Sequence, residues 1–234
     1  IDKEICKSAG IGNYGKNSLL INKKAGSFMN LGYLLTDIEI PADTIKEEDI
    51  CGTCILCVKA CPNNAIFEKG GINPKRCVSY LTQTKSYIPL EFRESMGRQI
   101  YGCDICQIVC PLNRDLLNNK TRDAYSDLEV DLEELLMISN IGFIKKYGGS
   151  AGGWRGRNIW KRNAVIAAGN LKIHSMFQTI KSELQNPSDM IKMYAAWSLL
   201  KLNKPSAENI LYDNLKYEND NVKSEYLKLL EEKL

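Results

Sequence analysis

The sequence has a single histidine among its 234 residues, and His174 stands in a polar stretch between two expected helices, so no catalytic role is expected for it. No apolar run reaches the roughly 18 residues that span a bilayer, so no association with a membrane is expected. The first residues show no positively charged leader with an apolar core, and no secretory signal is predicted. The chain opens on Ile1 instead of Met, from which we expect it to be a piece of a longer protein.

Acidic side chains are missing from one long stretch of the chain, although its overall composition is that of an ordinary globular protein. Residues 135–182 contain no Asp or Glu but eight Lys and Arg, whereas residues 115–134 contain seven acidic side chains. The net charge is only +3, so it is this uneven placement that predicts a face for a polyanion. The candidate residues are Arg155, Arg157, Lys161 and Arg162. The plainer alternative is a solvated helix face.

Cysteine, by contrast, is abundant, and eight of the nine residues follow a pattern. The first run has the spacing C-x2-C-x2-C-x3-C-P of bacterial ferredoxins, and the second repeats its latter part. In such two-cluster modules the last cysteine of each run ligates the cluster of the other run. We therefore assign one 4Fe-4S cluster to Cys51, Cys54, Cys57 and Cys110, and a second to Cys61, Cys77, Cys103 and Cys106.

Two other uses of these cysteines stay open. Zinc binds C-x2-C pairs, although its sites rarely use three cysteines at successive two-residue gaps followed by C-P. Disulfides need an oxidising compartment, and a chain of this length does not need them in order to fold. Cys6 is left over, and we expect it to be a small buried thiol.

The first 48 residues are predicted to form a helix over residues 1–9, a glycine-rich turn over 10–18, and strands over 19–21 and 27–40 joined by a turn at 23–26. The glycines indicate either a close approach to a cofactor or a sharp turn into a strand. Residues 49–115 form the cysteine module, with short strands near 65–67 and 71–73 and a helix after each run. Its insert, residues 79–101, suggests a cluster that faces a partner or a second cofactor.

The rest of the chain is predicted to be helical. Residues 116–150 read as an acidic connector with a helix over 132–139 and a flexible glycine stretch at 148–153. Residues 151–234 show a repeat: the pattern at 162–171 recurs at 193–202 and, more loosely, at 224–233. This period is typical of a short HEAT-like helical stack. Trp160 and Trp197 are expected in its core.

Together these motifs resemble one family, the epoxyqueuosine reductases of tRNA modification. The matching stretches are A-G-I-G at 9–12, G-K-N at 15–17, G-S at 26–27, L-L-T-D at 34–37, both cysteine runs, S-Y-L-T at 79–82, I-Y-G-C-D at 100–104 and R-N-A at 162–164. The resemblance covers nearly the whole chain. It implies an α+β protein: the remnant of an α/β cobalamin domain (1–48), a two-cluster ferredoxin-like module (49–115), a connector (116–150) and the HEAT-like stack (151–234).

The resemblance also implies a function. Epoxyqueuosine in the anticodon loop of tRNA would be reduced to queuosine, the last step of queuosine synthesis, with electrons passing through two 4Fe-4S clusters to cobalamin. It places Ile21, Asn22, Gly32, Leu35, Ser79 and Asp104 near cobalamin. The basic residues named above would contact the anticodon arm of tRNA. The acidic proton donor is expected upstream of residue 1, so no catalytic residue is assigned. We expect a cytoplasmic monomer whose electron donor the sequence does not identify.

Two other functions compete with this one. A two-cluster ferredoxin-type electron carrier with a helical interaction domain would have no use for the blocks at 10–17 and 27–37. A different corrinoid reductase, such as a relative of the reductive dehalogenases, would need no basic helical surface.

Overall fold

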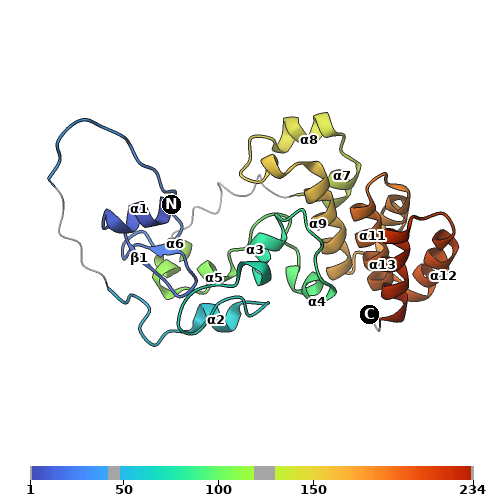
Figure 1. Cartoon of the computed structure of the whole chain (residues 1–234), viewed down its shortest axis with the longest axis horizontal. Helices are drawn as coiled ribbons and strands as arrows, with labels where there is room; N and C mark the ends of the chain where they lie inside the picture. Colours follow the sequence, from blue (N-terminus) through green and yellow to red (C-terminus); the bar gives the residue numbers. More distant parts are fainter. Residues whose placement is uncertain (1, 42–47, 119–129, 233–234) are drawn as a thin grey trace. The chain divides into compact units, whose positions relative to one another are not determined.

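The computed structural model describes residues 2–41, 48–118 and 130–232 of the chain (Figure 1). The chain divides into two compact units. One, the cysteine unit, comprises Ile1–Cys77 and Cys103–Leu128. The other, the helical unit, comprises Val78–Gly102 and Glu129–Leu234. The insert, residues 79–101, therefore belongs to the helical unit. The four domains expected from the sequence stay a prediction.

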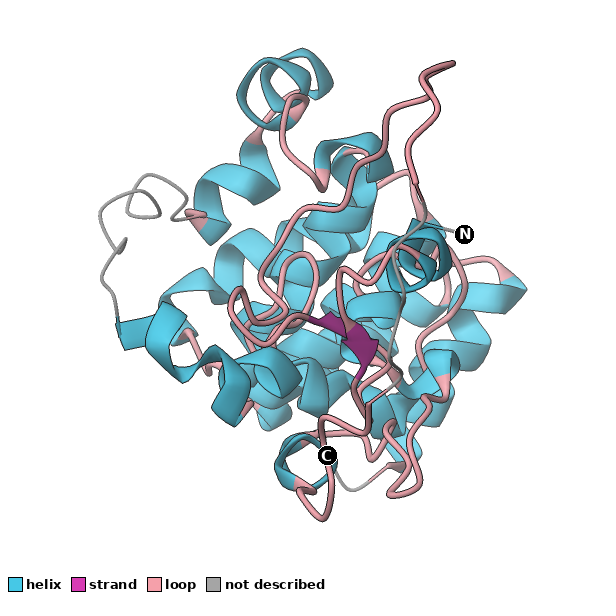
Figure 2. Ribbon diagram, turned by 90° about the vertical axis from the view of Figure 1, so that its left-hand side faces the viewer, coloured by secondary structure: helices cyan, strands magenta, loops and turns pink. Residues whose placement is uncertain are grey.

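The cysteine unit consists of short elements joined by turns. They are α1 (Asp2–Ser8), β1 (Asn13–Tyr14), β2 (Leu20–Ile21), α2 (Leu56–Ala60), η1 (Pro74–Arg76), α5 (Ile105–Ile108), η3 (Pro111–Asn113) and α6 (Arg114–Asn118). Strands β1 and β2 pair antiparallel, the small sheet drawn in magenta in Figure 2. Helices α2 and α5, which lie within the two cysteine runs, contact each other.

Glycine allows the backbone before β2 to come close to that strand. A Cβ on Gly12 would lie 2.4 Å from the carbonyl oxygen of Ile21. Of the two explanations offered for these glycines, the structure supports the sharp turn into a strand, because the chain approached here is the protein's own backbone. The predicted turn at 23–26 is confirmed by an antiparallel bridge between Asn22 and Gly26.

The long strand predicted over residues 27–40 is wrong. The described part of this segment has no strand, and Leu34 and Leu35 are 94% and 96% exposed. Its apolar side chains have the composition of a strand, but no neighbouring segment pairs with its backbone, and a strand needs such a partner. The expected helix after each cysteine run is correct only for the second run, where η3 and α6 follow. After the first run the chain forms an isolated bridge between Ile66 and Ile72, within the two short extended segments that were predicted.

The helical unit holds most of the buried apolar side chains. Its elements are α3 (Val78–Leu81), α4 (Leu90–Arg93), η2 (Glu94–Met96), α7 (Leu132–Met137), α8 (Asn140–Tyr147), η6 (Gly153–Arg155), α9 (Arg157–Asn170), η7 (His174–Met176), α10 (Phe177–Ser182), η8 (Glu183–Gln185), α11 (Asp189–Leu202), α12 (Lys204–Leu215) and α13 (Asp220–Glu231). The predicted helix over 132–139 is confirmed as α7. No described helix is long and apolar enough to cross a bilayer.

Helices α9 and α11 form the centre of this unit, and α11 also packs against α12 and α13. The three sequence copies fall on α9, α11 and α13, although the HEAT-like assignment itself stays a prediction. Trp160 and Trp197 are buried, as predicted. A Cβ on Gly169 of α9 would lie 2.8 Å from Oγ of Ser198 on α11, so the absence of a side chain is what lets the two helices approach.

The glycine stretch at 148–153 is not the flexible boundary that was predicted. Gly152 packs against the rings of Tyr101 and Trp160, where a Cβ would lie 2.7 Å or less from the nearest ring atoms. A Cβ on Gly153 would lie 2.2 Å from the carbonyl oxygen of Tyr147. These glycines are required by close packing inside the helical unit.

Candidate functional site

All eight patterned cysteines belong to the cysteine unit, and each is a free, half-buried thiol. Cys51 and Cys54 lie in the turn before α2, Cys57 lies on α2, and Cys61 ends that helix. The other four are arranged in the same manner around η1, α5 and η3: they are Cys77, Cys103, Cys106 and Cys110. Cys6 is a buried free thiol, as predicted.

The electrostatic neighbours of the thiols fall into two groups. Burial raises the pKa of Cys57, and the negative charges of Cys51, Cys54 and Cys110 raise it further. The pKa of Cys110 is raised by burial and then by Cys51 and Cys54. The last cysteine of the second run therefore lies among the first three cysteines of the first run.

The second group is built in the same way. Burial raises the pKa of Cys103, and the charges of Cys77 and Cys61 add to this. The pKa of Cys106 is raised to about 12, by burial first and then by Cys103 and Cys77, with a smaller contribution from Cys57. Thiols that repel one another in this way need cations, or protons, to neutralise them.

Among the described residues, the thiols of each group do not converge on a single metal ion. In the part of the chain that the structure describes, no three His, Cys, Asp or Glu side chains converge closely enough to hold one metal ion. In a cubane cluster each thiolate binds a different iron, so its ligands do not share one centre. The donor set, with four thiols in each group, fits two such clusters.

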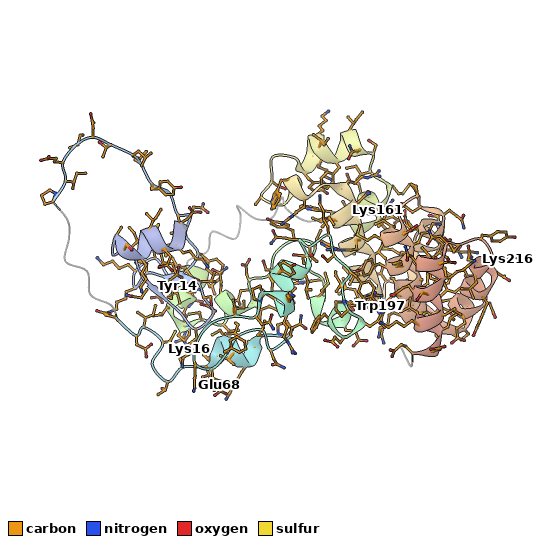
Figure 3. The ribbon with its side chains drawn as sticks, viewed as in Figure 1. Tyr14, Lys16, Glu68, Lys161, Trp197 and Lys216 are labelled. Carbon is orange, nitrogen blue, oxygen red and sulfur yellow. The ribbon has the colours of Figure 1, made fainter. Side chains whose placement is uncertain are left out.

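Backbone N–H groups point at two of the sulfurs. The N–H of Lys16 donates to Sγ of Cys51 at 3.4 Å, and the N–H of Ala65 donates to Sγ of Cys61 at 3.2 Å. The ammonium group of Lys16 holds the carbonyls of Gly52 and Cys54 at 2.9 and 3.0 Å. No role was predicted for Lys16 from the sequence, although it belongs to the G-K-N block of the resemblance. Figure 3 labels Lys16 on the cysteine unit.

A cavity of about 590 Å³ opens beside the first group of cysteines. Lys3, Tyr14, Lys16, Lys69 and Cys51 are among the residues that line it. Three lysines against one acidic residue, Asp49, give the wall of this cavity a positive character, which suits an anionic neighbour.

The residues predicted to contact cobalamin lie in different segments of the chain, and their role stays a prediction. Ile21 is buried against the glycine turn, and both polar atoms of the Asn22 side chain are bonded to nearby backbone. Gly32 and Leu35 lie in the segment without regular structure. The other two predicted residues belong to different units: Ser79 is held by Gln83 in the helical unit, and Asp104 accepts a hydrogen bond from Gln107 in the cysteine unit.

Two of the four predicted RNA contacts are wrong. Arg162 is fully buried and Lys161 is 6% exposed, so neither is part of an exposed basic face. Lys161 forms a buried ion pair with Glu183 at 2.7 Å, and Arg162 donates to backbone carbonyls. Arg155 and Arg157 remain partly exposed, and the guanidinium of Arg155 lies 3.7 Å from the ring centre of Trp154, which is 66% exposed.

Residues 50–113 match the family described as the 4Fe-4S double cluster binding domain. This match and the two groups of thiols define a 4Fe-4S double cluster binding domain within this chain.

Comparison with whole proteins goes further. An epoxyqueuosine reductase from Listeria monocytogenes is 40% identical over 223 residues, covering 94% of this chain and 59% of the relative. A crystal structure of an epoxyqueuosine reductase with an epoxyqueuosine-modified tRNA-Tyr stem loop matches with a TM-score of 0.87 at 35% identity, covering 99% of this chain and 63% of that one. An uncharacterized protein from the gldA 3' region of Geobacillus stearothermophilus is 37% identical over 215 residues, covering 88% of this chain and 97% of that protein. The chain is a homologue of the epoxyqueuosine reductases and spans about 60% of their length.

Proposed function

We propose that this chain provides the cluster-bearing and RNA-binding part of an epoxyqueuosine reductase, which reduces epoxyqueuosine in the anticodon loop of tRNA to queuosine. The observation that supports this most directly is the crossed grouping of eight thiols in one unit of a chain homologous to those reductases.

Each group of four thiols would hold one cluster. The first group is Cys51, Cys54, Cys57 and Cys110, and the second is Cys61, Cys77, Cys103 and Cys106. When bound, such clusters transfer single electrons, and reduction of an epoxide to an alkene requires two. The part played by the chain is to keep the thiolates in place and to tune them, since N–H groups directed at sulfur, such as that of Lys16, stabilise negative charge on the ligands.

Cobalamin is part of the proposal for the whole enzyme, as the resemblance implies. The described residues do not form a corrin site: Asn22 has its polar atoms bonded elsewhere, and Gly32 and Leu35 are exposed on an irregular segment. No step is assigned to cobalamin on this chain.

RNA binding is proposed at the exposed part of the basic stretch, formed by Trp154, Arg155 and Arg157. We call these three residues the η6 surface. The indole of Trp154 and the guanidinium of Arg155 form a flat, positively charged pair. Such a pair suits RNA, because its planes can stack on a nucleobase and its charge attracts a phosphate. A homologue has been crystallised with a tRNA stem loop, which supports a partner of this kind.

Anaerobic reconstitution tests the proposal. We expect the chain to take up iron and acid-labile sulfide in equal amounts, enough for two clusters, and to bind the stem loop of a tRNA anticodon arm. Zinc uptake without sulfide would overturn it. Serine at Cys51 should remove one cluster, whereas serine at the unpatterned Cys6 is the matched control and should leave both in place.

A second function fits the same cysteine unit, in which the polar atoms of Asn22 are bonded to nearby backbone and Leu35 is exposed. The alternative is an electron carrier with a helical interaction domain. Two clusters without any binding of a tRNA stem loop would select this alternative.

A further inference from the structure

Helix α9 presents buried polar side chains to the insert, which the structure assigns to Val78–Gly102 of the helical unit. The guanidinium of Arg162 donates to the carbonyl oxygens of Thr84 at 2.6 Å and Leu81 at 2.8 Å. The amide of Asn163 donates to the carbonyls of Thr82 at 2.7 Å and Ile100 at 2.6 Å.

The charge of Arg162 makes this arrangement unusual. Among the described residues no carboxylate lies within ion-pair distance of it, and its hydrogen-bond partners are two carbonyls and the side chain of Asn163. Burial lowers its pKa to about 10. Burying a cation without a counter-ion is costly, and here the carbonyl oxygens that accept from its fixed fork of donors offset that cost.

Asn163 and Thr82 join the two ends of the insert. The Asn163 amide bonds one carbonyl near each end, and the hydroxyl oxygen of Thr82 accepts from the N–H of Gly102 at 2.9 Å. Gly102 has a φ of +74°, a conformation that favours glycine and turns the chain sharply. We call Arg162, Asn163 and Thr82 the α9 clamp.

The insert lies in the sequence between two cysteines of the second group. Cys77 directly precedes it and Cys103 directly follows it. Closing the insert at its ends is therefore a way to bring the two thiols together, since loop closure otherwise costs chain entropy.

We propose that Arg162 and Asn163 are positioning residues for the second cluster, because the α9 clamp closes the insert and thereby sets the approach of Cys77 and Cys103. This rests on the cluster assignment in the proposed function. The helical unit would then have a task in electron transfer besides any contact with RNA, and cluster geometry would depend on an intact α9.

The test compares clamp variants with a neighbour on the same helix. Arg162→Met and Asn163→Leu remove the donors, and Thr82→Val is a nearly isosteric third variant. Lys161→Met is the matched control: it breaks a buried ion pair of the same helix with Glu183, away from the insert. Each protein is reconstituted anaerobically, and iron, sulfide, the electron paramagnetic resonance spectrum of the reduced form and the melting temperature are measured.

We expect the Arg162 and Asn163 variants to lose about half of the iron and sulfide, leaving the spectrum of one cluster. Thr82→Val should keep both clusters with an altered spectrum or potential for one. Lys161→Met should melt earlier yet keep both clusters unchanged.

Full cluster content and an unaltered spectrum in Asn163→Leu and Thr82→Val would overturn the inference, whether or not Arg162→Met folds. Equal cluster loss in Lys161→Met would overturn it too, because general destabilisation would then suffice. If the unaltered chain itself bound no cluster, the proposed function would fail instead.

Discussion

The ion pair between Arg93 and Glu225 offers a direct test of how the insert is attached to the last helix. Arg93 is fully buried, and its Nη2 donates to Oε1 of Glu225 at 2.7 Å. The hydroxyl of Tyr87 donates to the same carboxylate at 2.9 Å, and Nη1 of Arg93 has no hydrogen-bond partner. The cation also lies 4.5 Å from the ring centre of Tyr194. Glu225→Gln would leave this buried charge uncompensated.

The expected loss of stability follows from that geometry. Removing one partner of a buried pair costs about 3–5 kcal/mol. We expect Glu225→Gln near the lower end, about 3 kcal/mol, because the amide still accepts a hydrogen bond from Tyr87. At roughly 2–4 °C per kcal/mol for a chain of this size, the melting temperature should fall by about 6–12 °C. Far-UV circular dichroism follows this transition, since the affected unit is helical.

A double variant separates charge from packing. Arg93→Met combined with Glu225→Leu replaces the pair by apolar side chains, which is often close to neutral, so most of the lost stability should return. If Glu225→Gln melted within about 1 °C of the unaltered protein, or if the double variant were less stable than either single one, the reasoning would be refuted.

Three further predictions follow from other contacts. Gly169→Ala should destabilise the helical unit by about 1–3 kcal/mol in a thermal melt, although Ala favours helix, because its Cβ meets Ser198 of α11. The pKa of Tyr87 is raised to about 12, chiefly by burial, so the folded form keeps a proton that the unfolded form loses above pH 10. The free energy of unfolding should therefore fall as the pH rises from 10 to 12. Tyr87→Phe should reduce this dependence on pH in alkaline denaturation. Arg155→Glu should weaken binding of an RNA stem loop and lower its salt dependence by about one ion in fluorescence anisotropy, while bound RNA quenches Trp154, the exposed indole.

Each of these has a control or a contrary outcome. Gly149→Ala is the matched control for Gly169, because a Cβ there meets no atom within 4 Å, and an equal loss in both would contradict the packing argument. An unchanged alkaline slope in Tyr87→Phe would show that the buried Tyr194 and Tyr226, whose pKa values are also raised by burial, account for it. Lys216→Glu is the control for Arg155→Glu: it makes the same change of charge at the end of α12, and RNA binding should not respond to it.

The cysteine pattern could be predicted from the sequence because its information is local. Ligand spacing along the chain determines which thiols can face one cluster, so the crossed grouping needed no knowledge of the fold. The strand expected at 27–40 failed for the opposite reason. Pairing depends on a second segment, and nothing in the sequence of Leu34 and Leu35 says whether one is present.

The error at Lys161 and Arg162 is of a third kind. Lys and Arg are seldom fully buried, so the basic stretch was interpreted as one surface. The structure shows why this interpretation failed: every residue from Ile159 to Gly169 is buried, and a helix surrounded on all sides by protein has no exposed polar face. The adjacent Arg-Asn pair inside such a helix predicts buried polar bonding. Which carbonyls it bonds could not be predicted, because they lie about 80 residues earlier.

The route of the chain has a consequence for how such a protein can be inherited. The polypeptide leaves the cysteine unit after Cys77, comes back at Cys103 and departs again after Leu128. No single break in the chain separates the two units. A chain truncated at either end therefore loses cysteines or leaves the donors of Arg162 and Asn163 without acceptors. Recombination that replaces one unit would have to exchange two separate segments at once, which ties the evolutionary fate of the helices to that of the cysteines.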